Sequence, residues 1–232
     1  MSRTKLANRV LPIYTKGEEI FNMTSHIVGG AFGIAATALC VVMACINKNV
    51  YGIVTASIYG FSIILLYVIS SIYHGLRANS TAKKVFQILD HCSIFVLIAG
   101  TYTPIALCNI RSLDTASGWW LFGIIWFAAI LGIVLNSIDL KSYKVFSMIC
   151  YLLMGWAIIF KFELLLNSMN LNGIVLIALG GIAYTIGAIL YGVGKKKKYL
   201  HSIFHLFILL GTILQFFAIL FYVMWKFNKY KK

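Results

Sequence analysis

Long apolar runs, each about as long as a bilayer is thick, recur along almost the whole chain. About 20 apolar residues suffice for a helix to cross a membrane, and none of these runs alternates apolar and polar residues as a strand would. We expect seven transmembrane helices near residues 22–46, 51–76, 85–109, 118–137, 145–166, 172–194 and 200–225. The pattern thus predicts an all-α, polytopic integral membrane protein, with residues 1–232 in one seven-helix domain.

The composition agrees with this pattern. Of 232 residues, 61% are hydrophobic and only 11% are charged, which is too apolar for a soluble domain. Residues 1–20 form a polar, basic tail without a signal-peptide pattern, so we expect the first span to direct insertion. Residues 226–232 form a second basic tail. We expect a multi-pass protein of the plasma membrane.

The formal net charge of +14 bears on orientation. Because the cations lie in loops and tails, we interpret them as a positive-inside signal and expect no nucleic-acid partner. With a cytoplasmic N-terminus, the inner loops contain Arg77, Lys83, Lys84, Lys141, Lys144 and Lys195–Lys198. The outer loops contain only Lys48 and Arg111. With seven spans the C-terminus lies outside, so the basic residues of the second tail contradict the positive-inside rule. An even number of spans would remove this conflict.

Two features predict how spans pack. Gly29 and Gly33 form a GxxxG face on the first span, which lets another helix approach closely. Pro104 lies in the third span, where it removes a backbone hydrogen bond and favours a bend. The glycines indicate packing only, and the bend at Pro104 either widens a cavity or is purely structural.

His201 and His205 are four residues apart at the start of the seventh span. A helical period of about 3.6 residues puts both imidazoles on one face. An ionisable pair inside a membrane is costly without a partner, and a metal ion is a partner suited to two ring nitrogens.

The predicted topology brings other polar residues to the same depth. His74 lies one turn from the inner end of the second span, with Ser70 four residues earlier on the same face. Asp90 lies about a turn and a half into the third span. His74, Asp90, His201 and His205 therefore fall in one layer near the cytoplasmic face.

Three neutral imidazoles with one open position are typical of a catalytic zinc site. Zinc lowers the pKa of a bound water to about 7. Asp90 could then accept the proton of this water or hold the water by a hydrogen bond, and Ser70 could hydrogen-bond the water or polarise a substrate carbonyl. The alternative is that the histidines hydrogen-bond to Ser, Thr or backbone groups of neighbouring helices.

The remaining polar residues of this layer have less defined roles. Glu19, Asn22 and His26 share one face of the first helix through steps of three and four residues. His26 either supports the site or simply packs. His91 follows Asp90 but is rotated by about 100° from it, which favours a structural role.

Five segments carry a resemblance to a known family. They are Glu19-x-x-Asn22-x-x-Ser25-His26, Ser70-x-x-x-His74-Gly75-Leu76, Leu89-Asp90-His91, Ala99-Gly100-Thr101-Tyr102-Thr103-Pro104 and His201-x-x-x-His205. In this order they resemble the hemolysin III branch of the progestin and adipoQ receptor superfamily, which includes the adiponectin receptors. The likeness covers essentially the whole chain, with Ser25 where Thr is common. The absence of a long N-terminal extension favours a bacterial member.

The resemblance implies seven helices, a cytoplasmic N-terminus and a zinc site near the inner face. The family's three zinc ligands fall on His74, His201 and His205, and its water-linked residues fall on Asp90 and Ser70. Ceramidase-type amide hydrolysis is attributed to the animal receptors. The bacterial branch is named for haemolytic activity and has been linked to membrane-lipid homeostasis.

Three functions stay open from the sequence. The first is a zinc-dependent hydrolase of amide or ester bonds in a lipid that enters from the bilayer. The second is a membrane sensor or regulator of lipid homeostasis, stabilised by zinc. The third is a cytolytic membrane protein. The pattern does not identify a protein partner, and homo-oligomer formation stays open.

Overall fold

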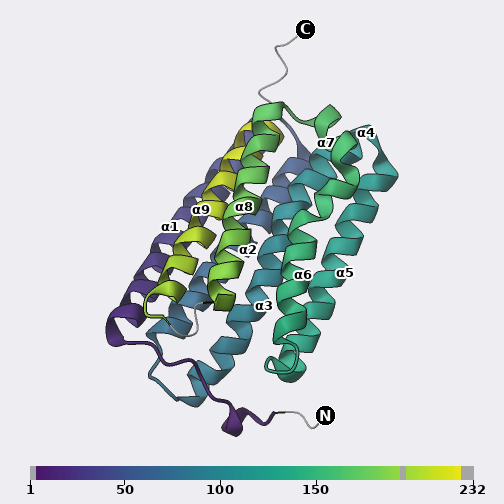
Figure 1. The fold of residues 1–232 in the computed structure, drawn as a ribbon. Helices are drawn as coiled ribbons and strands as arrows, with labels where there is room; N and C mark the ends of the chain where they lie inside the picture. The colour runs from purple at the N-terminus through teal and green to yellow at the C-terminus, as the bar shows by residue number, and fades with distance from the viewer. Residues whose placement is uncertain (1–3, 194–196, 226–232) are drawn as a thin grey trace.

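The structure is a computed structural model that describes residues 4–193 and 197–225. The predicted basic tail at 226–232 lies outside the described residues, as do Lys195 and Lys196. Figure 1 shows a bundle of long helices whose first and last described residues lie at opposite ends. Seven helices in the described part are long and apolar enough to cross a membrane, so the expected all-α fold and number of spans are confirmed.

The spans include short segments of other helical type. The first two are α1 (Lys16–Ile46) and α2 (Val50–Gly75). The third joins α3 (Thr81–Pro104), the π-helical η2 (Ile105–Ile110) and α4 (Arg111–Leu113), and the fourth is α5 (Thr115–Asp139). The fifth joins α6 (Lys144–Trp156), the 3₁₀ segment η3 (Ala157–Lys161) and α7 (Phe162–Ser168). The last two are α8 (Leu171–Val193) and α9 (Leu200–Ile219), which continues as the π-helical η5 (Leu220–Met224).

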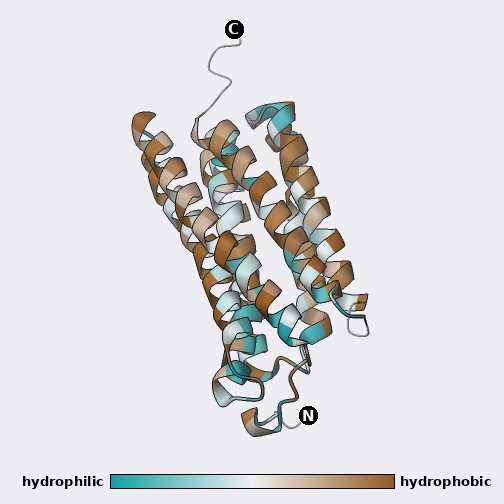
Figure 2. Cartoon of the chain, turned by 90° about the vertical axis from the view of Figure 1, so that its left-hand side faces the viewer, coloured by the Kyte–Doolittle hydropathy of each residue, from teal (hydrophilic) through white to brown (hydrophobic). Residues whose placement is uncertain are grey.

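The third span lies at the centre of the bundle. Of its most apolar window, 83% is buried, against 17% for the fifth span. The helix passes Pro104 and continues as the wide π-helical η2. In Figure 2 hydrophobic residues dominate the middle of the helices and hydrophilic ones gather toward their ends, as expected for a bundle surrounded by lipid.

The first helix begins earlier than the apolar pattern predicts. Thr15 and Glu18 form a capping box: the Glu18 N–H donates to the Thr15 hydroxyl, and the Thr15 N–H donates to the Glu18 carboxylate. This box starts α1 at Lys16, so residues 16–20 belong to the helix and not to a tail.

The segment before α1 is folded against the end of the bundle. The backbone N–H and hydroxyl of Thr4 donate to Asp139 Oδ2 at 3.0 and 2.9 Å. Lys84 Nζ donates to the Ala7 carbonyl at 2.7 Å, and Leu11 is buried. Residues 4–15, which belong to the predicted basic tail at 1–20, cross the end of the bundle where α1 and α9 begin and α2 ends. We call this end the N-terminal end of the bundle.

Small residues bring α1 against α2, as the GxxxG face predicts. A Cβ at Gly29 would lie 2.4 Å from Tyr67 Cδ1, and one at Gly33 would lie 2.7 Å from Ile63 Cγ2. These distances leave no room for a side chain, so the glycines are needed for the close approach. The approach carries one face of α1 toward the polar residues at the end of α2.

Candidate metal centre

Three histidines from two helices converge at the N-terminal end of the bundle. The last turn of α2 supplies His74, and the first two turns of α9 supply His201 and His205. One ring nitrogen of each lies within 4.8 Å of the others. The four-residue spacing of the α9 pair places both rings on the face that meets α2.

The spacing of these rings fits a single ion. His201 Nε2 and His205 Nε2 face each other at 2.9 Å. The ring centroid of His74 lies 5.4 Å from that of His201 and 5.0 Å from that of His205. Because Zn–N bonds are about 2.0–2.1 Å, two ligands of a tetrahedral zinc have nitrogens roughly 3.3 Å apart. Small side-chain shifts would bring this group to that separation.

Burial gives a second reason for a ligand here. His74 and His205 are 3% and 2% exposed. Within the described part of the chain, His74 Nε2 is buried and has no hydrogen-bond partner. A buried polar atom without a partner is costly, and a metal would satisfy it. The residues present thus fit the ion that the resemblance implies.

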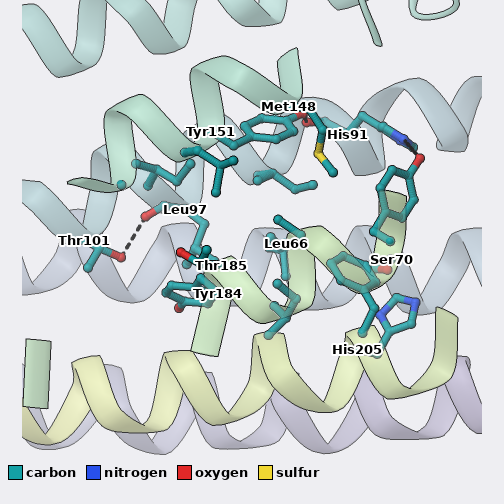
Figure 3. Close-up of a pocket in the computed structure, with 18 of the residues that line it drawn as sticks. Leu66, Ser70, His91, Leu97, Thr101, Met148, Tyr151, Tyr184, Thr185 and His205 are labelled. Atoms are coloured by element: carbon teal, nitrogen blue, oxygen red, sulfur yellow. Dashed lines mark hydrogen bonds between the residues drawn. The ribbon is translucent and has the colours of Figure 1, made fainter. Parts of the chain in front are cut away.

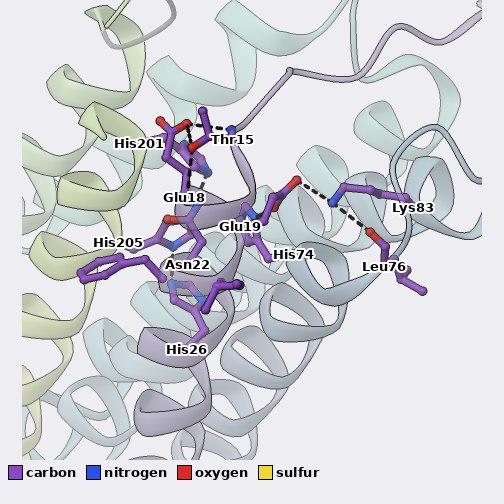
Figure 4. Close-up of polar contacts among 12 residues, drawn as sticks. Thr15, Glu18, Glu19, Asn22, His26, His74, Leu76, Lys83, His201 and His205 are labelled. Atoms are coloured by element: carbon purple, nitrogen blue, oxygen red, sulfur yellow. Dashed lines mark hydrogen bonds and ion pairs between the residues drawn. The ribbon is translucent and has the colours of Figure 1, made fainter. Parts of the chain in front are cut away.

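A charged pair lies directly behind His74 (Figure 4). Glu19 Oε2 accepts from His74 Nδ1 at 2.6 Å, and Lys83 Nζ donates to Glu19 Oε1 at 2.7 Å. Lys83 Nζ also donates to the Leu76 carbonyl at 3.2 Å. We expected Lys83 to contribute to the charge of an inner loop, but its side chain is buried and paired.

The other two residues of the α1 face also point to this cluster (Figure 4). His26 Nε2 contacts His205 Nδ1 in a T-shaped arrangement with ring centroids 4.0 Å apart. Asn22 is fully buried, and neither of its amide atoms has a partner among the described residues. His26 therefore lies against a candidate ligand, which favours the supporting role among the two readings.

A cavity of about 150 Å³ opens beside the histidines. Ser70, Asp90, His201 and His205 line its polar end. Ser70 Oγ is buried and has no partner in the described chain, and the Asp90 side chain is 17% exposed. Figure 3 shows Ser70 and His205 at one end and Thr101 toward the other. The long wall between is mainly apolar, with Leu66, Leu97, Ile98, Ile105, Ile158 and Ile177.

His91 lies in the same layer, but both of its ring nitrogens form hydrogen bonds to residues outside the histidine cluster. Nδ1 lies 2.9 Å from the Gln87 carbonyl, which accepts from it, and Nε2 accepts from the Tyr191 hydroxyl at 2.9 Å. Asp90 Oδ2 is 4.0 Å from the His91 ring. These bonds agree with the structural role that its rotation from Asp90 suggested.

Tyr14 is a site residue that the sequence pattern did not reveal. Its ring stacks on His201 with centroids 4.7 Å apart, and with Pro12 it lines the cavity. Burial raises the pKa of its hydroxyl well above the ordinary value, and the neighbouring Tyr73 adds to the effect. Tyr14 lies outside every apolar run, so only the folded path of residues 4–15 places it over the cluster.

The fold and cluster define a class of membrane proteins: seven helices with a potential metal centre at one end. The family model for haemolysin-III related proteins matches residues 14–216, and the chain belongs to this family. Among its relatives is Hemolysin-3 from Bacillus cereus, which is 37% identical over 89% of this chain and 92% of its own length. Hemolysin-3 homolog from Bacillus subtilis is also 37% identical, over 90% of this chain and 96% of its own length.

A more distant similarity extends to animals. The monocyte to macrophage differentiation factor of Homo sapiens is 28% identical over 72% of this chain and 69% of its own length. The resemblance to the hemolysin III branch is therefore confirmed across most of the sequence.

Proposed function

We propose that this protein is a zinc-dependent hydrolase that cleaves amide or ester bonds of membrane lipids near the cytoplasmic face. The observation that carries the proposal is the convergence of His74, His201 and His205 beside an apolar cavity that also contains Ser70 and Asp90. The polar groups that could carry the reaction lie at one end of this apolar cavity. A lipid substrate needs both, because its polar linkage must reach these groups while its acyl chain stays in an apolar environment.

His74, His201 and His205 would hold the ion. Three imidazoles are the protein ligands of known catalytic zinc sites that keep a fourth position open. When bound, zinc would lower the pKa of water at that position to about 7 and polarise a carbonyl.

The chain's own residues would carry the remaining steps. Asp90 accepts the proton of the attacking water and passes it to the leaving nitrogen or oxygen. Ser70 donates a hydrogen bond to the substrate carbonyl oxygen, where negative charge develops. The water oxygen forms a bond to the carbonyl carbon, and the bond between that carbon and the leaving nitrogen or oxygen breaks. The apolar wall of the cavity holds the acyl chain.

The test is turnover by the purified protein on a panel of N-acyl and O-acyl lipids in lipid nanodiscs. We expect metal-dependent release of fatty acid, abolished by His201→Ala and lowered about 10²–10⁴-fold by Asp90→Asn. Asp114→Asn is the matched control, because it removes the same charge at the far end of the bundle. No metal-dependent release from any amide or ester lipid contradicts the proposal.

A regulatory role is the second candidate. It is supported by the position of the cluster where α1, α2 and α9 meet, because a bound ion would tie α2 to α9. Zinc would then stabilise one arrangement of the helices, and the basic loops would pass the signal to a partner. Stoichiometric zinc with no turnover, together with unfolding on chelation, favours this candidate.

The printed names of the Bacillus relatives add cytolysis as a third candidate. A protein that itself permeabilises membranes releases dye from liposomes at low protein-to-lipid ratio. We expect no such release.

A further inference from the structure

We propose that one face of α1 sets the proton positions of the metal-binding histidines. Glu19 and His26 act as positioning residues that keep His74 and His205 protonated at Nδ1, so that both Nε2 atoms present lone pairs to one ion. The inference rests on the proposed metal centre and assigns a role to a helix that contributes no ligand.

The contact between Glu19 and His74 fixes the first ring. An ionised carboxylate only accepts hydrogen bonds, so the 2.6 Å contact requires the proton on His74 Nδ1. In a neutral imidazole the other nitrogen then carries the lone pair. That nitrogen, Nε2, is buried and has no partner in the described chain.

Lys83 holds Glu19 in this orientation. The two carboxylate oxygens are divided, with Oε2 on His74 and Oε1 on the Lys83 ammonium at 2.7 Å. Lys83 is itself held by the Leu76 carbonyl, two residues after His74. The buried cation favours the ionised carboxylate, which is the form that cannot donate to the ring.

His26 orients the second ring. Its Nε2 contacts His205 Nδ1, while His205 Nε2 faces His201 Nε2 at 2.9 Å. If His205 donates from Nδ1 to His26, its Nε2 lone pair points to the shared space. With the reverse donation a proton would occupy His205 Nε2 and block the ion.

The spacing on α1 explains why one helix serves two ligands. Glu19 and His26 are seven residues apart and lie on one face, one beside each helix that supplies histidines. The capping box at Thr15 fixes where this face begins, and Gly29 brings it close to α2. Partners that orient metal ligands in this way typically contribute 10- to 100-fold to metal affinity.

The experiment measures Zn²⁺ affinity of the full chain in detergent by competition with a chromogenic chelator. We expect Glu19→Leu and His26→Leu each to bind Zn²⁺ about 10- to 100-fold more weakly than wild type. Glu19→Gln keeps an acceptor oxygen and His26→Gln replaces the acceptor nitrogen with one, so both variants should lose less affinity. Glu163→Leu is the control, because Glu163 is an exposed carboxylate on α7, at the other end of the bundle. Unchanged affinity in both leucine variants overturns the inference.

A second measurement avoids the need for the variants to fold. In wild-type protein labelled with ¹⁵N-histidine and loaded with Zn²⁺, the rings of His74 and His205 should carry their protons at Nδ1. A proton at Nε2 of either ring overturns the inference.

The two proposals fail separately. Weaker Zn²⁺ binding in the leucine variants without lipid turnover in wild type supports the positioning role and contradicts the hydrolase. Turnover in wild type with unchanged affinity in both leucine variants contradicts the positioning role alone.

Discussion

At the scale of single residues, a chain of polar groups at the candidate metal centre is stabilised by hydrogen bonds and ion pairs between its neighbouring members. Lys83 is 2% exposed inside an apolar bundle, and Glu19 and the Leu76 carbonyl satisfy its ammonium. Glu19 in turn bonds to His74. A buried charge is tolerated when it is paired, so removing one member leaves the next uncompensated.

Lys83→Met should therefore destabilise the protein. We expect the free energy of unfolding to fall by about 2–3 kcal/mol, because the Glu19 carboxylate loses its charged partner. Denaturant unfolding in mixed micelles measures this change. Lys84→Met is the matched control, because its ammonium is exposed and bonds only to the Ala7 carbonyl among the contacts seen. Equal losses in the two variants would contradict the pairing argument.

The residues of the centre differ in how far the sequence reveals them. His201 and His205 follow from helical spacing, and His74, Asp90 and Ser70 follow from the depth that the topology gives them. The contacts of Lys83 and Tyr14 were missed. Lys83 lies in the first turn of α3 and reaches Glu19 on α1, and Tyr14 depends on the path of residues 4–15 across the end of the bundle. Contacts of these kinds leave no periodic signal in the sequence.

At the scale of elements, apolar length predicts the spans well but not their polar ends. The first helix begins at Lys16 because a capping box starts it among polar residues, where hydropathy gives no signal. The 3₁₀ segment η3 and the π-helical η2 and η5 were also not predicted, because side-chain packing decides such local changes of helical type.

The close approach of α1 and α2 gives a prediction at this scale. A methyl group in Gly29→Ala would meet the Tyr67 ring, and overpacking of this kind costs about 1–3 kcal/mol. Gly123→Ala, with no atom within 4 Å of the added Cβ, should cause no loss of stability. Thermal unfolding of the two variants compares them directly. A Gly29→Ala melting temperature equal to that of Gly123→Ala would argue against tight packing of α1 on α2.

At the scale of the whole molecule, the odd number of spans puts the two ends of the described chain on opposite sides of the membrane. We propose that the N-terminal end of the bundle faces the cytoplasm, because most loop cations gather there. The candidate metal centre then lies near the inner leaflet. The sequence predicts this orientation through the charges and through the family resemblance, whereas apolar length is the same from either side.

Cysteine labelling on intact cells tests the orientation. In a background with Cys45 replaced by Ser, Asn172→Cys should react with a membrane-impermeant maleimide, because Asn172 is exposed in the first turn of α8, at the outer end of the bundle. Ala78→Cys, exposed between α2 and α3, should react only after the cells are opened. The opposite pattern would place the histidines on the outer side.

The central claim is that three histidines from α2 and α9 hold one metal ion. Elemental analysis of the purified chain tests it most directly. We expect about one zinc per chain in wild type and in His91→Ala, whose ring bonds to Gln87 and Tyr191 outside the cluster. His74→Ala, His201→Ala and His205→Ala should each lose most of that zinc. Folded wild-type protein without stoichiometric metal after supply of zinc, or full retention of zinc in the three alanine variants, would contradict the account.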